Sequence, residues 1–142
     1  MKNILFICQA NIGRSQMAEA FYNKLSKTNS ATSAACEDFV QKYNSTITSE
    51  IVDTMDEIGI DITNQRMKLL TPKMVSRAEK IIVLCDRKFC PEFLLSAKDK
   101  VIIKTLKDPH DCDPKTVSQI RDQIIKIVEK IIIKESKNAK QK

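Results

Sequence analysis

The sequence predicts an α/β fold in which a parallel sheet is covered by helices on both faces. Short apolar, β-branched runs recur along the chain, as expected of strands that are buried on both faces. Amphipathic stretches with helical spacing lie between these runs. Strands that alternate with helices form parallel sheets through right-handed crossovers. The 142 residues are enough for one such domain with its own core.

Four segments are the predicted strands: 3–8, the weaker candidate 30–35, 80–85 and 101–106. The first of them follows a methionine and a lysine, and its apolar run is too short for a signal peptide or a membrane span. We therefore interpret it as a buried strand of a cytoplasmic protein, and we expect no association with a membrane.

The stretch after the first strand predicts a helix with one apolar stripe. Ser15 is its expected N-cap, and the helix runs to about Lys27. The stripe consists of residues at helical spacing: Met17, Ala18, Phe21, Tyr22 and Leu25. We expect this stripe to face the sheet.

Three further helices are predicted from the residues at their ends. One begins at Thr48 or Ser49 and ends at Gly59, a residue that readily adopts the left-handed backbone of a helix end. Thr71 and Asp113 each precede a proline, an arrangement typical of a helix N-terminus. The last helix is long and leads into a lysine-rich segment.

The net charge of +6 does not indicate a nucleic-acid-binding surface. Residues 134–142 carry four lysines and one glutamate, and we assign them to a tail outside a single domain that covers residues 1–133. The remaining excess is interleaved with acidic residues, and only seven aromatic residues are available to stack on bases. We expect no nucleic-acid partner, whereas a basic surface suits small anionic substrates.

The chain has five cysteines, namely Cys8, Cys36, Cys85, Cys90 and Cys112. Their odd number, in a chain without an export signal, predicts no structural disulfide framework. Cys36 and Cys112 are interpreted as ordinary cysteines. A zinc site formed by Cys85, Cys90, His110 and Cys112 is not favoured, because one residue between a histidine and a cysteine is not a familiar ligand spacing. We therefore expect no metal, and His110 is interpreted as a partly exposed loop residue beside the site.

The loop after the first strand, CQANIGRS at residues 8–15, carries the candidate site. Ligands of open α/β sheets bind at the carboxyl ends of the strands. A tight loop that enters a helix presents backbone N–H groups and a helix dipole to an anion. Arg14 can bind two oxygens of a tetrahedral oxyanion, and Asn11 and Gly13 tolerate the left-handed backbone that such a loop needs.

Cys8 lies at the base of this loop, where hydrogen-bond donors surround it. Such an environment favours the thiolate over the thiol, and Ser15 can donate a further hydrogen bond to it. A thiolate below a bound tetrahedral anion is a nucleophile directed at the central atom. The alternative is a buried strand-end cysteine and a surface arginine, but their place in the predicted fold favours the catalytic interpretation.

The stretch ICQANIGRSQMAEAF, residues 7–21, resembles the signature of the low-molecular-weight protein-tyrosine-phosphatase superfamily, which includes the thioredoxin-coupled arsenate reductases. The likeness continues to the last helix through segments 59–66, 81–86 and 107–111. The resemblance implies a four-stranded parallel sheet of order 2-1-3-4, flanked by helices.

The resemblance also implies roles for individual residues. Cys8 is the nucleophile, Arg14 binds the oxyanion, and Asp108 of an Asp-Pro pair is the general acid. The remaining loop residues that bind the oxyanion are Gln9, Ala10, Asn11, Ile12 and Gly13. A physical argument supports Asp108, since it follows the fourth predicted strand at the sheet edge of Cys8 and a leaving oxygen must be protonated as it departs.

Two branches of the superfamily differ in the step after attack by Cys8. A phosphatase hydrolyses the intermediate with water, whereas a reductase displaces the arsenic with a second thiol. The segment LCDRKFCP, residues 84–91, resembles the redox segment of the reductases and contains Cys85 and Cys90. We therefore favour an arsenate reductase with a relay through Cys8, Cys85 and Cys90 and a thioredoxin-like reductant.

Two alternatives remain to the reductase interpretation. One is a phosphatase that hydrolyses phosphate monoesters through a Cys8 phosphoenzyme, and the other is a non-catalytic module that binds oxyanions. Cys90 then is a small apolar residue packed beside Phe89 and Phe93. The lack of an aromatic residue in the Asp108 loop argues against an aryl phosphate substrate.

The resemblance to the reductases further implies a site for a monovalent cation such as potassium. The matching positions offer oxygen ligands: Asn11, Glu19, Ser33 and Asp61. In the alternative interpretation, Asn11 and Ser33 brace the loop through hydrogen bonds and Glu19 faces solvent. No other cofactor is expected, and we expect a monomer.

Overall fold

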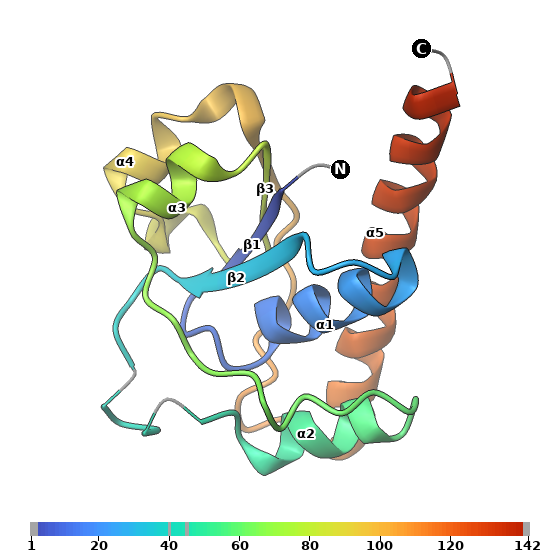
Figure 1. The fold of residues 1–142 in the computed structure, drawn as a ribbon. Helices are drawn as coiled ribbons and strands as arrows, with labels where there is room; N and C mark the ends of the chain where they lie inside the picture. Colours follow the sequence, from blue (N-terminus) through green and yellow to red (C-terminus); the bar gives the residue numbers. More distant parts are fainter. Residues whose placement is uncertain (1–2, 40, 45, 141–142) are drawn as a thin grey trace.

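The computed structural model describes residues 3–39, 41–44 and 46–140 (Figure 1). Within these residues the sheet has four parallel strands in the order β2-β1-β3-β4. The strands are β1 (Ile4–Cys8), β2 (Ala31–Ala35), β3 (Lys80–Val83) and β4 (Val101–Ile103). The predicted fold class and strand order are therefore confirmed.

The strand register brings three carboxyl ends to one edge of the sheet. Cys8 of β1 pairs with Ala35 of β2, and Ile7 pairs with Val83 of β3. Backbone pairing continues beyond the ends of β3 and β4, where the N–H group of Leu106 donates to the carbonyl oxygen of Leu84 at 2.9 Å. Residues that directly follow these strands therefore meet at the same edge.

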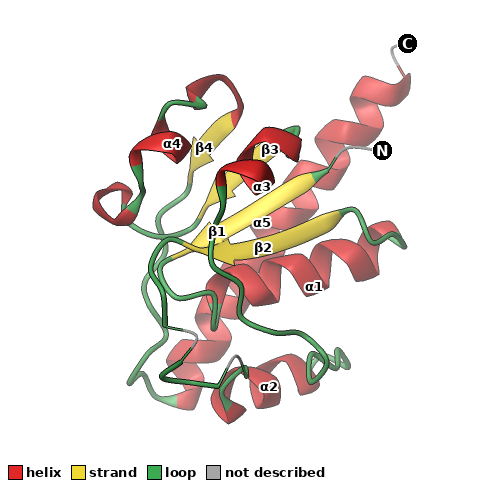
Figure 2. Cartoon of the chain, turned by 60° about the vertical axis from the view of Figure 1, so that its left-hand side comes forward, coloured by secondary structure: helices red, strands yellow, loops and turns green. Residues whose placement is uncertain are grey.

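The helices cover both faces of the sheet (Figure 2). One face packs against α1 (Arg14–Ser26), α2 (Ser49–Asp56) and α5 (Pro114–Lys140), and the other packs against α3 (Pro72–Arg77) and α4 (Glu92–Leu95). Two short 3₁₀ turns, η1 (Arg87–Phe89) and η2 (Lys98–Lys100), flank α4 among the described residues. The short α4 was not predicted from the sequence.

Side chains of β1 alternate between the two cores, as the pleat of a strand requires. Ile4 and Phe6 pack with α1, α2 and α5, whereas Leu5 and Ile7 pack with α3 and α4. All four are essentially inaccessible to solvent. The near-continuous apolar run at residues 3–8 therefore reflects a strand buried on both faces, as predicted.

Most of the predicted helix starts are confirmed. The Thr71 hydroxyl accepts a hydrogen bond from the N–H group of Met74 at 3.2 Å, and the Asp113 carboxylate accepts one from the N–H group of Thr116 at 2.8 Å. Thr48 precedes α2, and Gly59 beyond its end has a φ of +78°. These capping bonds satisfy backbone donors that a helix leaves unpaired.

Two predictions about the first helix are wrong. Helix α1 begins at Arg14 with Gly13 as the N-cap residue, so Ser15 lies inside the helix, where its hydroxyl contacts Sγ of Cys8. Leu25, in the last turn of α1, is 45% exposed, whereas Met17, Ala18 and Tyr22 are buried as predicted.

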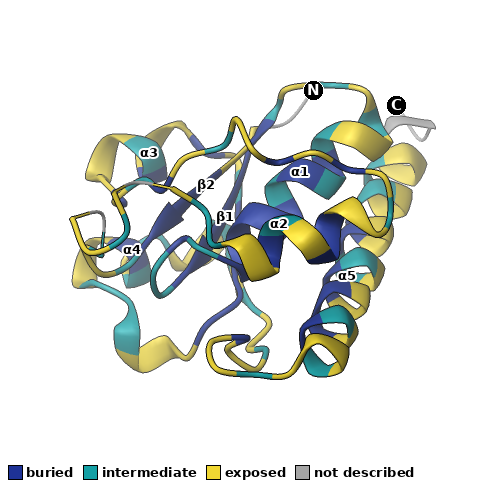
Figure 3. Cartoon of the chain, turned by 90° about the horizontal axis from the view of Figure 1, so that it is seen from below, coloured by how far each residue is buried: buried dark blue, intermediate teal, exposed yellow. Residues whose placement is uncertain are grey.

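Helix α5 continues to Lys140, so residues 134–140 extend the helix that packs on the sheet. Its inner face is buried, and its outer face is exposed along much of its length (Figure 3). The division into a domain of residues 1–133 and a tail stays a prediction. No helix within the described residues has the length and apolar character that crossing a bilayer requires.

Candidate active site

The loop between β1 and α1 forms a cup above the carboxyl end of β1. Asn11 adopts a φ of +56°, so the predicted left-handed residue is confirmed there. Gly13 has a φ of −114°, which any residue adopts, and its predicted left-handed conformation is wrong. A Cβ atom at Gly13 would lie 2.9 Å from Cγ of Pro109 and 3.1 Å from Cδ1 of Ile51. Gly13 is therefore needed for space between the cup and its neighbours.

Asn11 is fully buried, and its side chain fixes the hydrogen bonding inside the cup. Its Oδ1 atom accepts hydrogen bonds from Nε2 of Gln16 at 2.9 Å and from the N–H group of Lys68 at 2.8 Å. The amide group must therefore turn its Nδ2 atom toward Ser15, to whose hydroxyl oxygen it donates at 2.7 Å. The orientation of the amide thus follows from two independent donors.

The orientation of the Asn11 amide also determines how Ser15 interacts with Cys8. Its hydroxyl oxygen lies 2.9 Å from Sγ of Cys8. Because Asn11 already donates to that oxygen, the hydroxyl proton is available to donate to the sulfur. A hydrogen bond donated to sulfur stabilises a thiolate. Cys8 is buried at the base of the cup, as predicted.

Arg14 is the first residue of α1 and is only 5% exposed. Its Nη1 atom donates to the carbonyl oxygens of Leu106 at 2.9 Å and Leu84 at 3.3 Å. Its Nη2 atom lies 4.0 Å from Oδ2 of Asp108. The chain segments after β3 and β4 therefore hold one edge of the guanidinium, while another nitrogen faces the carboxylate of Asp108.

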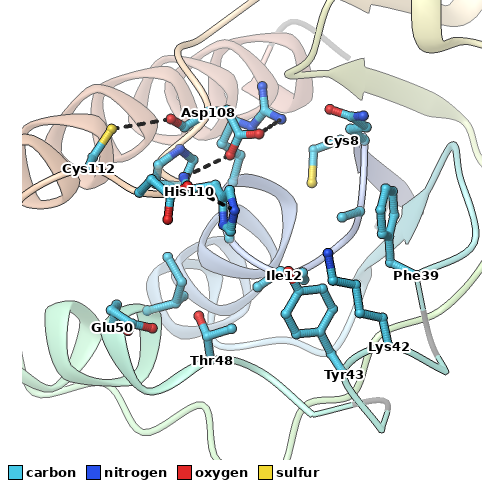
Figure 4. Close-up of a pocket in the computed structure, with 17 residues that line it drawn as sticks. Cys8, Ile12, Phe39, Lys42, Tyr43, Thr48, Glu50, Asp108, His110 and Cys112 are labelled. Carbon is cyan, nitrogen blue, oxygen red and sulfur yellow. Dashed lines mark hydrogen bonds and ion pairs between the residues drawn. The ribbon is translucent and has the colours of Figure 1, made fainter.

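Asp108 and Cys8 line the same pocket, whose volume is about 730 Å³ (Figure 4). The Asp108 side chain is 53% exposed, and its Oδ1 atom accepts a hydrogen bond from the N–H group of His110 at 2.9 Å. His110 is an exposed loop residue at the pocket, close to its predicted position. The loop that bears Asp108 therefore faces the cup directly.

Aromatic side chains form another wall of the pocket, and the sequence analysis missed them. Phe39 and Tyr43 lie in the segment after β2, together with Lys42 (Figure 4). No aromatic residue stands in the Asp108 loop, but these two residues supply aromatic surface from a distant part of the chain. The pocket therefore suits an aryl group, contrary to the expectation from the Asp108 loop. Only tertiary structure brings this segment to Cys8.

A cluster of three thiols lies beside the cup. The sulfur atoms of Cys36, Cys85 and Cys90 all lie within 4.8 Å of one another. Cys36 follows β2, and its N–H group donates to the carbonyl oxygen of Cys8 at 3.0 Å. The sequence analysis interpreted Cys36 as an ordinary cysteine and missed this neighbourhood, which arises because the parallel register places the end of β2 beside that of β1.

The thiols of this cluster differ in their electrostatics. A hydrogen bond from the Cys36 thiol and then the positive charge of Arg14 lower the pKa of Cys85, against the effect of burial. The same hydrogen bond and burial raise the pKa of Cys36. Burial, followed by the charge on Cys85, raises the pKa of Cys90 to about 11. Cys85 is thus the one thiol of the cluster whose pKa is lowered, whereas the pKa values of Cys36 and Cys90 are raised.

Cys112 belongs to the pocket and not to the thiol cluster. Its thiol donates to the carbonyl oxygen of Asp108 at 3.5 Å. His110 and Cys112 both line the pocket, whereas Cys85 and Cys90 group with Cys36. The zinc arrangement that the sequence analysis considered is therefore divided between two places in the structure.

The family model for low molecular weight phosphotyrosine protein phosphatase matches residues 3–142. The chain belongs to this family. The chain is also 34% identical, over 93 residues, to an arsenate reductase of Bacillus cereus (strain AH187) and to an arsenate reductase of Brevibacillus brevis (strain 47). These matches cover 63% of this chain and span 65% of the length of each relative.

Solved structures agree with the family assignment. An arsenate reductase in a phosphate-binding state superposes with a TM-score of 0.78 at 27% identity, over 94% of this chain and 98% of that one. An arginine phosphatase from Geobacillus stearothermophilus superposes with a TM-score of 0.86 at 18% identity, over 99% of this chain and 97% of that one. The latter similarity shows the fold.

Of the four residues suggested as ligands for a cation, Ser33 and Glu19 are in direct contact. The Ser33 hydroxyl donates to Oε1 of Glu19 at 2.9 Å, and Nζ of Lys68 lies 3.5 Å from the same atom. The Glu19 side chain is only 12% exposed, so the alternative that it faces solvent is wrong. Asp61 is exposed and accepts hydrogen bonds from Thr63, which lower the pKa of its carboxyl.

Proposed function

We propose that the protein is an arsenate reductase that uses Cys8, Cys85 and Cys90 in sequence. The position of Cys85 carries this proposal. The thiol of Cys85, whose pKa is lowered by Cys36 and then by Arg14, lies at the sheet edge where Cys8 ends β1, and the sulfur atom of Cys90 is within 4.8 Å of its sulfur atom. The similarity to arsenate reductases of Bacillus cereus and Brevibacillus brevis supports it.

In the proposed reaction, arsenate binds to the loop N–H groups and Arg14, and the Cys8 thiolate forms a bond to arsenic while an oxygen leaves as water. Cys85 then attacks the sulfur of Cys8. The electron pair of the broken S–As bond stays on arsenic, which is thereby reduced from the pentavalent to the trivalent state. Arsenite leaves, and a Cys8–Cys85 disulfide remains.

Cys90 regenerates the nucleophile in the second half of the proposed cycle. Its thiolate attacks Cys85, which releases Cys8 and forms a Cys85–Cys90 disulfide. A dithiol reductant of the thioredoxin class then reduces this disulfide. Burial and then the charge on Cys85 raise the pKa of Cys90 to about 11, and formation of the Cys8–Cys85 disulfide removes the second of these causes.

The test is arsenate-dependent oxidation of reduced thioredoxin, with hydrolysis of an aryl phosphate measured on the same samples. Cys90→Ser should abolish thioredoxin-coupled turnover, while one stoichiometric reduction of arsenate and the aryl phosphate hydrolysis persist. Mass spectrometry of the arsenate-treated parent protein should show the Cys85–Cys90 linkage. Thioredoxin-coupled turnover by Cys90→Ser at the parent rate would disprove the relay.

A second candidate function, hydrolysis of phosphate monoesters, is favoured by the aromatic wall of the pocket. Phe39 and Tyr43 offer apolar surface to an aryl group whose phosphate lies in the cup. Asp108 would protonate the leaving oxygen, and water would then hydrolyse the Cys8 phosphoenzyme. Hydrolysis of an aryl phosphate without arsenate-dependent thiol oxidation would select this function.

We also propose a potassium ion near Asn11, Glu19 and Ser33, to which Asp61 would contribute after movement of its exposed loop. Lys68 now pairs with Glu19, so the ion and the ammonium group would compete for one carboxylate. Thermal unfolding in potassium chloride and in choline chloride at equal ionic strength tests this proposal, with a higher Tm expected in potassium.

We also propose that the protein is a monomer, and light scattering measures its oligomeric state.

A further inference from the structure

The thiol cluster of Cys36, Cys85 and Cys90 offers more than the two thiols that the relay uses. Each sulfur comes from a different place in the fold: the residue after β2, the segment after β3, and the residue after η1. All three side chains are of a type that ligates metals, and their sulfur atoms lie within 4.8 Å of one another. In the proposed relay no bond to the sulfur of Cys36 is formed or broken.

The spacing of the sulfur atoms suits one ion bound between them. A Zn–S bond of about 2.3 Å places two sulfur atoms of a tetrahedral site about 3.8 Å apart. The separations in the cluster are at most 4.8 Å, so a contraction of roughly 1 Å or less would bring the ligands into range. Cys36 and Cys90 are half-buried, which leaves a route from solvent to the buried Cys85.

The position of Cys36 fits a shared ion better than a disulfide with Cys85. Strand β1 lies between β2 and β3. Neighbouring strands are about 4.8 Å apart, so backbones two strands apart are separated by roughly 9.6 Å. A disulfide requires Cα atoms within about 7 Å. Two sulfur–ion bonds bridge a longer distance than one sulfur–sulfur bond, so an ion can join these thiols without moving the strands.

The chemistry of the ligands indicates which class of ion the cluster can bind, because all three donor atoms are sulfur. Sulfur ligands select soft, thiophilic ions over magnesium or calcium, which prefer oxygen. With three sulfur ligands, a zinc ion keeps one open position for water, and trivalent arsenic completes its coordination.

We propose that Cys36, Cys85 and Cys90 form a three-sulfur binding site for a thiophilic ion, either Zn²⁺ or trivalent arsenic. Binding needs no oxidant or reductant. With arsenous acid, three S–As bonds replace three As–OH bonds. The hydroxyl groups leave as three waters, each with the proton of one thiol. With Zn²⁺, the thiol protons pass to solvent, because ligating sulfur must be deprotonated.

The site stands independently of the proposed reductase, because Cys8 is not among its ligands. If the relay operates, a bound ion occupies Cys85 and Cys90 and stops thioredoxin-coupled turnover, whereas hydrolysis of an ester at Cys8 continues. Under the reductase function, trivalent arsenic is also the product, so the cluster would limit turnover as arsenite accumulates.

The first test measures which thiols a bound ion protects in the reduced parent protein. Samples with Zn²⁺, with arsenite and with neither are alkylated by iodoacetamide, and each cysteine is quantified by mass spectrometry. We expect protection of Cys36, Cys85 and Cys90 at one ion per chain, with Cys8 and Cys112 still alkylated. Protection by one of the two ions identifies the occupant. Alkylation of Cys36 at the unprotected rate with both ions would overturn the proposal.

The second test compares variants by calorimetric titration with Zn²⁺ and with arsenite. Cys36→Ser removes one ligand and should weaken binding by more than the ~10–100-fold lost when a residue hydrogen-bonded to a metal ligand is replaced. Cys112→Ser is the matched control, since its thiol lies outside the cluster, and it should bind like the parent protein. Cys8→Ser should also retain binding.

Circular dichroism of each variant verifies that it is folded. Parent-like binding by Cys36→Ser would disprove the three-sulfur site. Loss of binding in Cys8→Ser alone would also disprove it and would place the ion in the cup. If Cys36→Ser does not fold, the alkylation measurement on the parent protein decides.

Discussion

The cup and the thiol cluster lie at the same edge of the sheet but are built in different ways. The cup is one continuous segment, residues 8–15. Hydrogen bonds inside it join Asn11 to Ser15 and Ser15 to Cys8, although Lys68 also donates to Asn11 from a distant segment. The cluster gathers single residues from three distant segments, held by strand register and packing. The residues of the cup are therefore close together in the sequence itself, whereas those of the cluster meet only once the sheet has formed.

The comparison also separates two kinds of chemistry. The cup supplies donors around a nucleophile, which suits attack on an oxyanion. In the cluster, three thiol groups are neighbours of one another, which suits thiol exchange or binding of a soft ion. Arg14 links the two, because it approaches Asp108 in the pocket and lowers the pKa of Cys85 in the cluster.

The strongest test of the separation is Cys8→Ser. We expect a fall of roughly 10⁴-fold or more in both arsenate reduction and aryl phosphate hydrolysis, because no nucleophile remains in the cup. Initial rates of both reactions measure the loss. Arsenate reduction that survives in this variant would mean that the thiol cluster reacts with arsenate by itself, and the division of roles would be wrong.

Asp108→Asn should affect the cup alone. For an alkyl phosphate, whose leaving oxygen needs a proton, we expect a loss of about 10²–10⁴-fold, and a much smaller loss for a nitrophenyl phosphate. The dependence of kcat on leaving-group pKa measures the difference. Equal losses for good and poor leaving groups would show that Asp108 only positions its loop.

Gly13→Ala should disturb the contact between the cup and the Asp108 loop. The added Cβ would lie 2.9 Å from Cγ of Pro109, so the two loops must separate. We expect a cost of about 1–3 kcal/mol in the free energy of unfolding, as for other overpacked sites, with a fall in hydrolysis. Denaturant unfolding measures the cost. Unchanged stability and activity would mean that the loops adjust freely.

Asp113→Ala provides a reference outside both regions. The Asp113 carboxyl accepts hydrogen bonds from Thr116 at the start of α5, which lower its pKa below the ordinary value of 3.8. The parent protein should therefore keep this stabilisation above pH 3.8 and lose it as the pH falls through the lowered pKa. The variant should show a slightly lower Tm near neutral pH and no corresponding acid loss, which thermal unfolding at several pH values measures.

Both regions should function normally in Asp113→Ala. Loss of ion binding or of hydrolysis in that variant would mean that helix α5 controls the sheet edge, and the comparison of two independent regions would need revision.

The sequence by itself determined the strands, the caps at Thr71 and Asp113, and the cup with Cys8 and Arg14. These features depend on local rules, such as apolar periodicity and hydrogen bonds between residues close in sequence. It did not determine that Gly13 serves close packing, because that requires knowing where Pro109 and Ile51 lie.

Only the tertiary structure decided which distant residues meet at the carboxyl edge of the sheet. Cys36 and the aromatic wall both follow β2, and no local pattern marks them as neighbours of Cys8. The register of β1 with β2 places them there. A strand pairing fixes positions to within a few ångströms across long stretches of sequence, whereas the sequence near Cys36 or Phe39 encodes only the local backbone. The dispersed part of the site therefore appears only when the sheet is assembled.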